Sequence, residues 1–283
     1  MSLHSLLARR AQEAGPIRVG VIGAGKFGTM FLTQALHSDG LHVVAVADLD
    51  TGRARSALDR AGWPGERYAA ASYAEALRTG GTYVTDSADG LLGVPGLEVV
   101  CEMTGDPVAG AYHAERASDA GLHVVMVNVE ATFEARTGYA RRCFGEYGVP
   151  TDPTGRYAAL YRPCHLIGLE VGVSIASAVL RAEPTGTACG FHGDAVAVAK
   201  RDLEAGEVLD GEGGYMVYGK LAPAAASMRR RALPIGLARG VELCRDVPAG
   251  GLLSSADVRL DESLPAVRLR RELEASWLAA AGT

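Results

Sequence analysis

The sequence predicts an α/β protein: a doubly wound parallel sheet, then a helical connector and a small β-rich domain. Three observations support this prediction. A glycine-rich turn joins an apolar run to a helical pattern near the amino end, and strand and helix patterns alternate up to about residue 131. From about residue 183 glycine, valine and short apolar runs replace most helical signals. The expected units are residues 1–131, 132–182 and 183–283.

The first unit follows from alternating apolar and amphipathic segments. Strands are expected at residues 17–22, 42–47, 83–85, 98–103 and 123–127. Helices are expected at residues 2–15, 26–37, 51–61, 72–79 and 107–120. Ser72 is a typical helix N-cap, Pro107 suits a first helical turn, and Gly121 suits a helix stop.

Beyond residue 131 the pattern changes. A helix is expected at 139–147, a Pro/Gly/Asp-rich connection at 148–163 and an apolar helix at 165–180. The apolar helix is too short to span a bilayer and carries Glu170, so we expect it to be buried. Helical signals return at 268–281.

The β-rich unit contains an internal repeat. Residues 201–210 (RDLEAGEVLD) align with residues 245–254 (RDVPAGGLLS), and Arg, Asp, Ala, Gly and the second Leu coincide. Two copies are too few for a solenoid. We expect two similar loops, each with a glycine turn, that pair about a pseudo-symmetry axis.

The glycine-rich turn carries the main functional signal. It reads Gly23-x-Gly25-x-x-Gly28 after an apolar strand, and Asp48 ends the next strand 20 residues after Gly28. Gly23 permits a tight turn, Gly25 lets a pyrophosphate approach and Gly28 allows close helix packing, while the helix N-terminus offers N–H groups. The pattern predicts a dinucleotide-binding Rossmann domain; the alternative is a nucleotide-free domain that kept the turn. The candidate cofactor-binding residues are Gly23, Gly25, Lys26, Phe27, Gly28, Asp48, Thr104, Gly105 and Asn128.

The choice of dinucleotide stays open at this point. Asp48 would accept a hydrogen bond from a ribose 2′-OH and repel a 2′-phosphate, which favours NAD slightly. Arg53 and Arg55 follow within a turn and could hold that phosphate of NADP, or simply form a solvated helix face.

Composition excludes several classes of protein. The formal net charge of the 283 residues is −5, so no basic surface indicates nucleic-acid binding. The five cysteines are scattered without metal-ligand spacing and no signal peptide is visible, so we expect reduced thiols and a cytoplasmic protein. Lysine is rare and Ala, Gly and Arg are abundant, which is typical of a high-GC bacterial genome.

Candidate catalytic groups follow the later strands. Thr104, Gly105 and Asn128 are expected to line the nicotinamide side, although ordinary strand-end turns would look the same. Glu130 is the best-placed acid or base, the alternative being a solvated carboxylate. His165 and Lys220 are further candidates, with a core or capping histidine and a surface lysine as the alternatives.

Two other reactive side chains are not expected to take part in the chemistry. Cys101 lies inside an apolar strand, where a thiol is usually inert. His113, on the helix after Gly105, is expected to be exposed.

Several blocks resemble the homoserine-dehydrogenase-like oxidoreductases with a C-terminal SAF domain, which include the second type of deoxyxylulose-phosphate reductoisomerase. The blocks are residues 17–50, 99–106, 123–130, 155–168 and 190–260, with RDLEAG at 201–206 and LPIGLA at 233–238 on the SAF side. The resemblance implies a Rossmann domain that binds NAD(P) and a SAF domain. This chain departs from the family between Glu130 and Phe133, where the family carries a long middle segment that supplies most of the substrate pocket.

The sequence therefore predicts an NAD(P)-dependent oxidoreductase that acts on a small polar hydroxy or oxo compound, and the departure from the family suggests a step of specialised metabolism. Two alternatives remain: a non-catalytic dinucleotide-binding protein, and an isomerase or lyase that recycles bound NAD. Expected partners are a small-molecule substrate and a second copy of the chain, with no membrane and no nucleic acid.

Overall fold

The computed structural model describes residues 3–127, 133–134, 157–158, 167–186 and 190–281. The helix expected at 139–147 and most of the connection at 148–163 lie outside these residues. Two short strands between the units, β6 (Phe133–Glu134) and β7 (Tyr157–Ala158), pair antiparallel.

The amino-terminal unit is built on a five-stranded sheet of order β3-β2-β1-β4-β5. All four strand pairings are parallel. The strands are β1 (Ile17–Ile22), β2 (Leu41–Ala47), β3 (Tyr83–Thr85), β4 (Val99–Glu102) and β5 (His123–Met126). The predicted strands and the α/β fold class are confirmed, and the carboxyl ends of all five strands meet at one edge.

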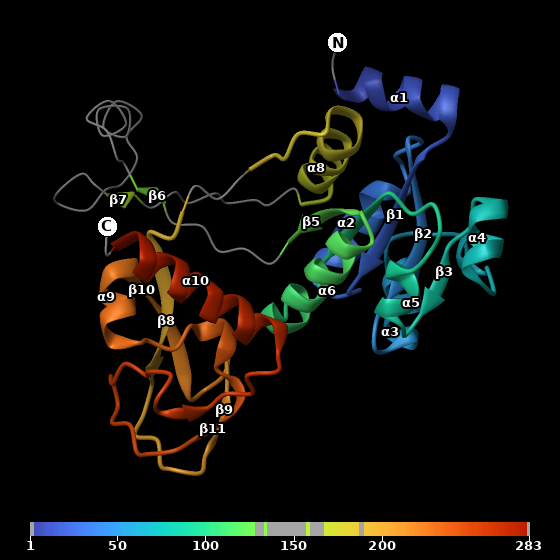
Figure 1. The fold of residues 1–283 in the computed structure, drawn as a ribbon. Helices are drawn as coiled ribbons and strands as arrows, with labels where there is room; N and C mark the ends of the chain where they lie inside the picture. Colours follow the sequence, from blue (N-terminus) through green and yellow to red (C-terminus); the bar gives the residue numbers. More distant parts are fainter. Residues whose placement is uncertain (1–2, 128–132, 135–156, 159–166, 187–189, 282–283) are drawn as a thin grey trace.

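Helices cover both faces of this sheet (Figure 1). On one face, Phe31 and Ile175 belong to the same apolar core as Val19 of β1. On the opposite face, Leu91 and Ala117 belong to a second apolar core. The first face carries α1 (Leu3–Ala14), α2 (Lys26–Ala35), α3 (Thr51–Arg60) and α8 (Ile167–Arg181). The second carries α4 (Tyr73–Thr79), α5 (Ala88–Leu92) and α6 (Pro107–Asp119). The helix α8, which we expected in the connector, therefore packs on the Rossmann sheet.

Helix ends follow local chemistry. The Ser72 side chain accepts a hydrogen bond from Glu75 N–H, as its N-cap position predicted, and Asp106 caps α6 in the same way. The short helix α5 was not predicted, because Gly90 and Gly93 break its pattern although Ser87 caps it.

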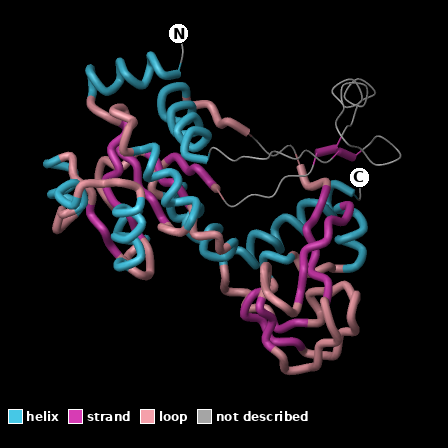
Figure 2. The backbone as a smooth tube through the Cα atoms, turned by 180° about the vertical axis from the view of Figure 1, so that it is seen from behind, coloured by secondary structure: helices cyan, strands magenta, loops and turns pink. Residues whose placement is uncertain are grey.

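The carboxyl-terminal unit is made of short antiparallel strands (Figure 2). They are β8 (Gly193–Ala199), β9 (Val208–Asp210), β10 (Val217–Pro223), β11 (Arg239–Leu243) and β12 (Val258–Arg259). Three helical segments complete the unit: α9 (Ala224–Arg230), the 3₁₀ turn η2 (Ile235–Leu237) and α10 (Pro265–Ala281). The sequence predicted α10 but missed α9, which spans only seven residues.

The two repeat loops pair as the sequence predicted. Leu203 and Val247 exchange two backbone hydrogen bonds of 2.9 Å. The aspartate of each loop accepts a backbone N–H of the other loop. These bonds run from Ala249 N to Asp202 Oδ1 and from Ala205 N to Asp246 Oδ1, both 2.8 Å. Each loop also turns on a glycine of positive φ, Gly206 at 87° and Gly250 at 76°.

The two units meet at the start of α6. Val108 packs against the apolar core of the carboxyl-terminal unit, and a side chain at Gly236 of η2 would lie 3.2 Å from the Pro107 ring. Arg239 Nη1 is 3.9 Å from Asp106 Oδ2, and Arg268 of α10 pairs with a carboxylate further along α6. The carboxyl-terminal unit thus contacts α6, the helix that begins at the carboxyl edge of the sheet.

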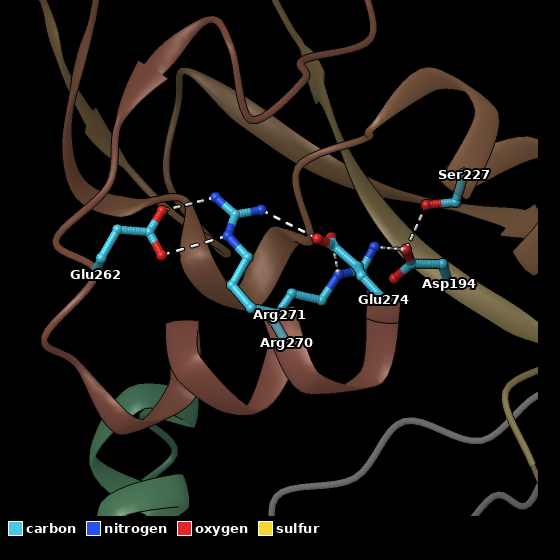
Figure 3. A network of polar contacts seen from close by, with 6 residues as sticks. All are labelled: Asp194, Ser227, Glu262, Arg270, Arg271 and Glu274. Atoms are coloured by element: carbon cyan, nitrogen blue, oxygen red, sulfur yellow. Dashed lines mark hydrogen bonds and ion pairs between the residues drawn. The ribbon is translucent and has the colours of Figure 1, made fainter. Parts of the chain in front are cut away.

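A network of charges anchors α10 to β8 (Figure 3). The buried Arg270 guanidinium lies 2.8 Å from Asp194 Oδ2, which also accepts a hydrogen bond from the Ser227 hydroxyl. Glu274 bridges Arg270, at 2.8 Å, and the more exposed Arg271, at 3.1 Å. Every charge in this buried part of the network has a partner of opposite sign.

Asp194→Leu should therefore lower the free energy of unfolding by about 3–5 kcal/mol, because it leaves Arg270 buried with less compensation. Arg271→Met is the matched control: it removes a neighbouring arginine on the same helix and should cost no more than about 1 kcal/mol. Urea denaturation of both variants measures the difference. Equal losses would mean that burial of Arg270 does not decide the energy of the network.

Candidate functional site

The glycine turn between β1 and α2 lies directly against the loop that follows β4. Gly23 has a φ of 96°, and a Cβ at this residue would lie 2.7 Å from the backbone of Met103 and of Thr104. Only glycine fits, both for its backbone conformation and for this close approach. The turn and the Thr104 loop therefore form one continuous corner at the carboxyl edge.

The next two glycines have opposite surroundings. A Cβ at Gly25 would meet nothing within 4 Å, whereas a Cβ at Gly28 would lie 2.3 Å from the Gly23 carbonyl oxygen. Gly25 is the N-cap of α2 and provides no side-chain cap, so the first-turn N–H groups of this helix are left for a ligand. Lys26 and Phe27 lie exposed in this first turn. The arrangement fits a pyrophosphate, because Gly25 has no side chain that would occupy the space beside the helix N-terminus.

Asp48 lies where the sequence placed it, at the end of β2, but its carboxylate points inward. Its side chain is 2% exposed. Oδ2 accepts the Ala24 N–H at 2.8 Å, and Oδ1 accepts the Asp50 N–H at 3.0 Å and the Arg53 guanidinium at 2.5 Å. Asp48 therefore fixes the glycine turn itself, and Arg53, which is 55% exposed, covers the carboxylate.

These contacts also set the charge state of Asp48. Burial alone would raise the pKa of the carboxyl, but the hydrogen bonds from Asp50, Ala24 and Arg53, with the charge of Arg53, outweigh burial and lower the pKa below its ordinary value. The carboxylate is thus held ionised near neutral pH.

The corner after β4 contains a carboxylate that the sequence analysis missed. Glu102 is fully buried, and its Oε1 accepts hydrogen bonds from the Thr104 N–H, at 3.2 Å, and from the Thr104 hydroxyl. His113 Nδ1 of α6 lies 3.5 Å from the same oxygen. The prediction that His113 is exposed is wrong: its side chain is 12% exposed, because it faces the buried carboxylate. A charged residue inside the run Glu98–Met103 was the available signal.

None of the described contacts places the other predicted catalytic residues, or Asn128, at this corner. Asn128, Glu130 and His165 lie outside the described residues. Lys220 lies exposed on β10, opposite Val196 of β8, within the carboxyl-terminal unit. Cys101 is fully buried, and burial raises the pKa of its thiol, as expected for an inert cysteine.

One cavity of about 320 Å³ lies at the other end of the sheet. Pro16, Leu41 and Thr82, near the amino ends of β1, β2 and β3, line it. It is therefore separate from the glycine turn, and we assign it no part in the candidate site.

Comparison with protein families finds one match in each unit. Residues 17–127 match the GFO_IDH_MocA family, described as an oxidoreductase family with an NAD-binding Rossmann fold. Residues 194–259 match the SAF domain. The chain is therefore similar to the Gfo/Idh/MocA oxidoreductases over residues 17–127 and to the SAF domain over residues 194–259. The predicted combination of Rossmann and SAF domains is confirmed, whereas the matching oxidoreductase family is Gfo/Idh/MocA and not homoserine dehydrogenase specifically.

Solved structures match part of this chain. A variant of KijD10, a 3-ketoreductase from Actinomadura kijaniata in complex with TDP-benzene and NADP, is 26% identical, with a TM-score of 0.29; the match covers 39% of this chain and 29% of that one. The WlbA dehydrogenase from Bordetella pertussis, in complex with NADH and UDP-GlcNAcA, is 18% identical, with the same TM-score and coverages. The chain thus spans less than a third of these relatives. A search of curated proteins finds no match.

Two further findings concern the described residues. No group of three or more His, Cys, Asp or Glu side chains among them could hold a metal ion. Among the same residues, no helix combines the length and the apolar character that a membrane span needs.

The depressed pKa of Asp48 predicts a pH-dependent contribution to stability. This contribution is complete above the ordinary value of 3.8 and is lost as the pH falls through the lower folded-state value. Asp48→Asn should therefore be less stable than the native chain at neutral pH, and the difference should shrink as the pH falls below about 4. Urea denaturation at a series of pH values measures it. A difference that stayed constant down to about pH 2 would show that the charge of Asp48 does not stabilise the turn.

Proposed function

We propose that the protein binds a nicotinamide dinucleotide across the glycine turn and transfers a hydride to or from a small polar hydroxy or oxo compound. One observation carries the proposal: the open space at Gly25 and the uncapped N-terminus of α2 lie beside the Thr104 corner. A pyrophosphate at the turn would direct the rest of the cofactor along the carboxyl edge, where ligands bind in such sheets. When bound, the nicotinamide would supply the hydride chemistry.

The protein's own residues would position the two ends of the cofactor. The N–H groups of α2 would bind the phosphates, and Thr104 and Gly105, both exposed, would contact the nicotinamide. We retain Glu130 as the proposed proton-handling group and Asn128 as a proposed nicotinamide contact, because both follow β5 in the sequence and β5 itself ends at the carboxyl edge. His165 and Lys220 remain second choices.

The family relationship, the substrate class, the location and the oligomeric state are proposals as well. The repeat loops and the Rossmann blocks support a relationship to the SAF-containing, homoserine-dehydrogenase-like enzymes within this broader class. TDP-benzene and UDP-GlcNAcA are ligands of the two solved structures, and for this chain we infer only a small polar substrate. A cytoplasmic location and a homo-oligomer also remain predictions.

Gly25→Asp tests cofactor binding with little disturbance of the fold. Gly25 has a φ of −71°, open space around its Cβ and an N-cap position, which suits aspartate. The variant should keep its melting temperature within a few degrees but lose at least tenfold in affinity for NADH or NADPH, because a carboxylate would occupy the place of the pyrophosphate. Fluorescence titration of the reduced cofactors measures this affinity.

Gly28→Ala is the matched control, since its Cβ would collide with the Gly23 carbonyl oxygen. It should lower the melting temperature as well as binding. If the native chain bound neither cofactor, or if Gly25→Asp bound both normally, the proposed function would fail. Tight binding with no turnover on any carbonyl or alcohol would favour the non-catalytic alternative, and cofactor that is consumed and regenerated would favour the recycling isomerase or lyase.

The choice between NAD and NADP depends, we propose, on Arg53 as much as on Asp48. The sequence favoured NAD because of Asp48, but that carboxylate is covered, and the guanidinium of Arg53 is the exposed charge. Arg53→Gln should uncover Asp48 and remove a partner for a 2′-phosphate, which shifts the ratio of NADPH to NADH affinity at least fivefold toward NADH. Arg55→Gln, on the same helix, is the control. An unchanged ratio in Arg53→Gln would remove Arg53 from cofactor selection.

A further inference from the structure

The buried carboxylate of Glu102 fixes the direction of one hydrogen bond at the corner. The Thr104 hydroxyl donates its proton to Glu102 Oε1, and the same oxygen accepts the Thr104 N–H at 3.2 Å. A second possible acceptor, the Asp106 carbonyl oxygen, is 3.5 Å from the hydroxyl and is the weaker choice. The only proton of the Thr104 hydroxyl is therefore directed into the protein.

This leaves the outward side of Thr104 with lone pairs only. A hydroxyl has one proton and two lone pairs. Asp106 N–H donates to Thr104 Oγ1 at 3.3 Å, which occupies one of the lone pairs. Thr104 is an exposed residue, and no donor among the described residues contacts the other lone pair, which is left for a ligand. Such a ligand must offer an N–H or O–H group.

The position of Thr104 indicates which part of the ligand it meets. Its backbone nitrogen is 2.7 Å from the place where a Cβ of Gly23 would lie, so it adjoins the turn that we assign to the pyrophosphate. A nicotinamide ring beyond that pyrophosphate carries a carboxamide with one C=O acceptor and one NH₂ donor. Of these two carboxamide groups, only the NH₂ group is complementary to the remaining lone pair of Thr104.

We propose that Glu102 is a positioning residue that makes the Thr104 hydroxyl an acceptor for the carboxamide N–H of the bound nicotinamide. His113, 3.5 Å from Oε1, holds the Glu102 carboxylate from the α6 side. The role of Glu102 is to supply a buried acceptor oxygen, and it does not touch the cofactor. This inference rests on the proposed function, because it needs a nicotinamide dinucleotide at the corner.

The test compares NADH with its reduced 3-acetylpyridine analogue, which keeps the C=O group but has a methyl group in place of NH₂. Fluorescence titration gives the ratio of the two affinities for each variant. Thr104→Val should lower the preference for NADH by about 3- to 10-fold relative to the native chain, which corresponds to the loss of one hydrogen bond. Thr104→Ser keeps the hydroxyl and should keep the preference.

Two variants of Glu102 separate positioning from mere packing. Glu102→Met removes the acceptor oxygen, so the Thr104 hydroxyl can turn outward as a donor, and the preference for NADH should fall as in Thr104→Val. Glu102→Gln retains an oxygen at this place and should restore the preference. If Glu102→Met does not fold, Thr104→Val and Thr104→Ser still decide whether the hydroxyl accepts the carboxamide N–H, and a loss of preference in Glu102→Gln would contradict the role given to the Glu102 oxygen.

Thr82→Val is the matched control for the loss of a threonine hydroxyl. Thr82 is buried and donates to the Val43 carbonyl at 2.6 Å, near the amino end of β3. The Thr82→Val variant should have a lower melting temperature than the native chain and an unchanged ratio of the two affinities. An unchanged ratio in Thr104→Val would overturn this inference and leave cofactor binding intact, whereas no binding of either dinucleotide by the native chain would overturn the proposed function.

Discussion

The contact between Gly23 and the backbone after β4 is the constraint on which the candidate site depends. A side chain at Gly23 would overlap the Met103 carbonyl group and the Thr104 nitrogen, so the two loops can lie this close only with glycine. The contact brings the N-terminus of α2 and the Thr104 corner together at neighbouring strands of the sheet. For a cofactor that spans both places, the protein groups that contact the phosphates and the ring would already be in position. This would reduce the entropy cost of ordering them on binding.

The carboxyl-terminal unit, which contains the SAF match and is called the SAF unit below, contacts the segment that follows the Thr104 corner. Pro107 lies against Gly236, and Asp106, the N-cap of α6, lies near Arg239. The helix α10 lies along both units, because Arg268 reaches α6 while Arg270 is buried against β8. The Thr104 corner is therefore held by the Rossmann sheet behind it and by the SAF unit beside it. This arrangement gives the carboxyl-terminal unit a structural part in the candidate site.

The sequence predicted best what depends on backbone conformation and apolar periodicity. The glycines of the turn, the five strands, the Ser72 cap and the pairing of the repeat loops follow from local rules that a single chain displays. The direction of polar side chains does not follow from such rules. Asp48 stands at the predicted position, yet its oxygens bind the glycine turn and Arg53, because neighbours distant in sequence provide the donors. Glu102 and His113 were missed for the same reason, since only the packing of α6 on β4 brings them together.

Asp48 and Glu102 show a common use of carboxylates at strand ends. Each accepts N–H groups of the loop that follows or adjoins its strand, and each has a basic side chain beside it, Arg53 or His113. Placed outward, two negative charges at this edge would repel a pyrophosphate. Turned inward, they fix the loops and leave the helix N–H groups of α2 and one hydroxyl lone pair to face the ligand. Under the proposed function, the acids would act on a dinucleotide only through the backbone that they hold, so their positions, and not their exposure, mark the candidate site.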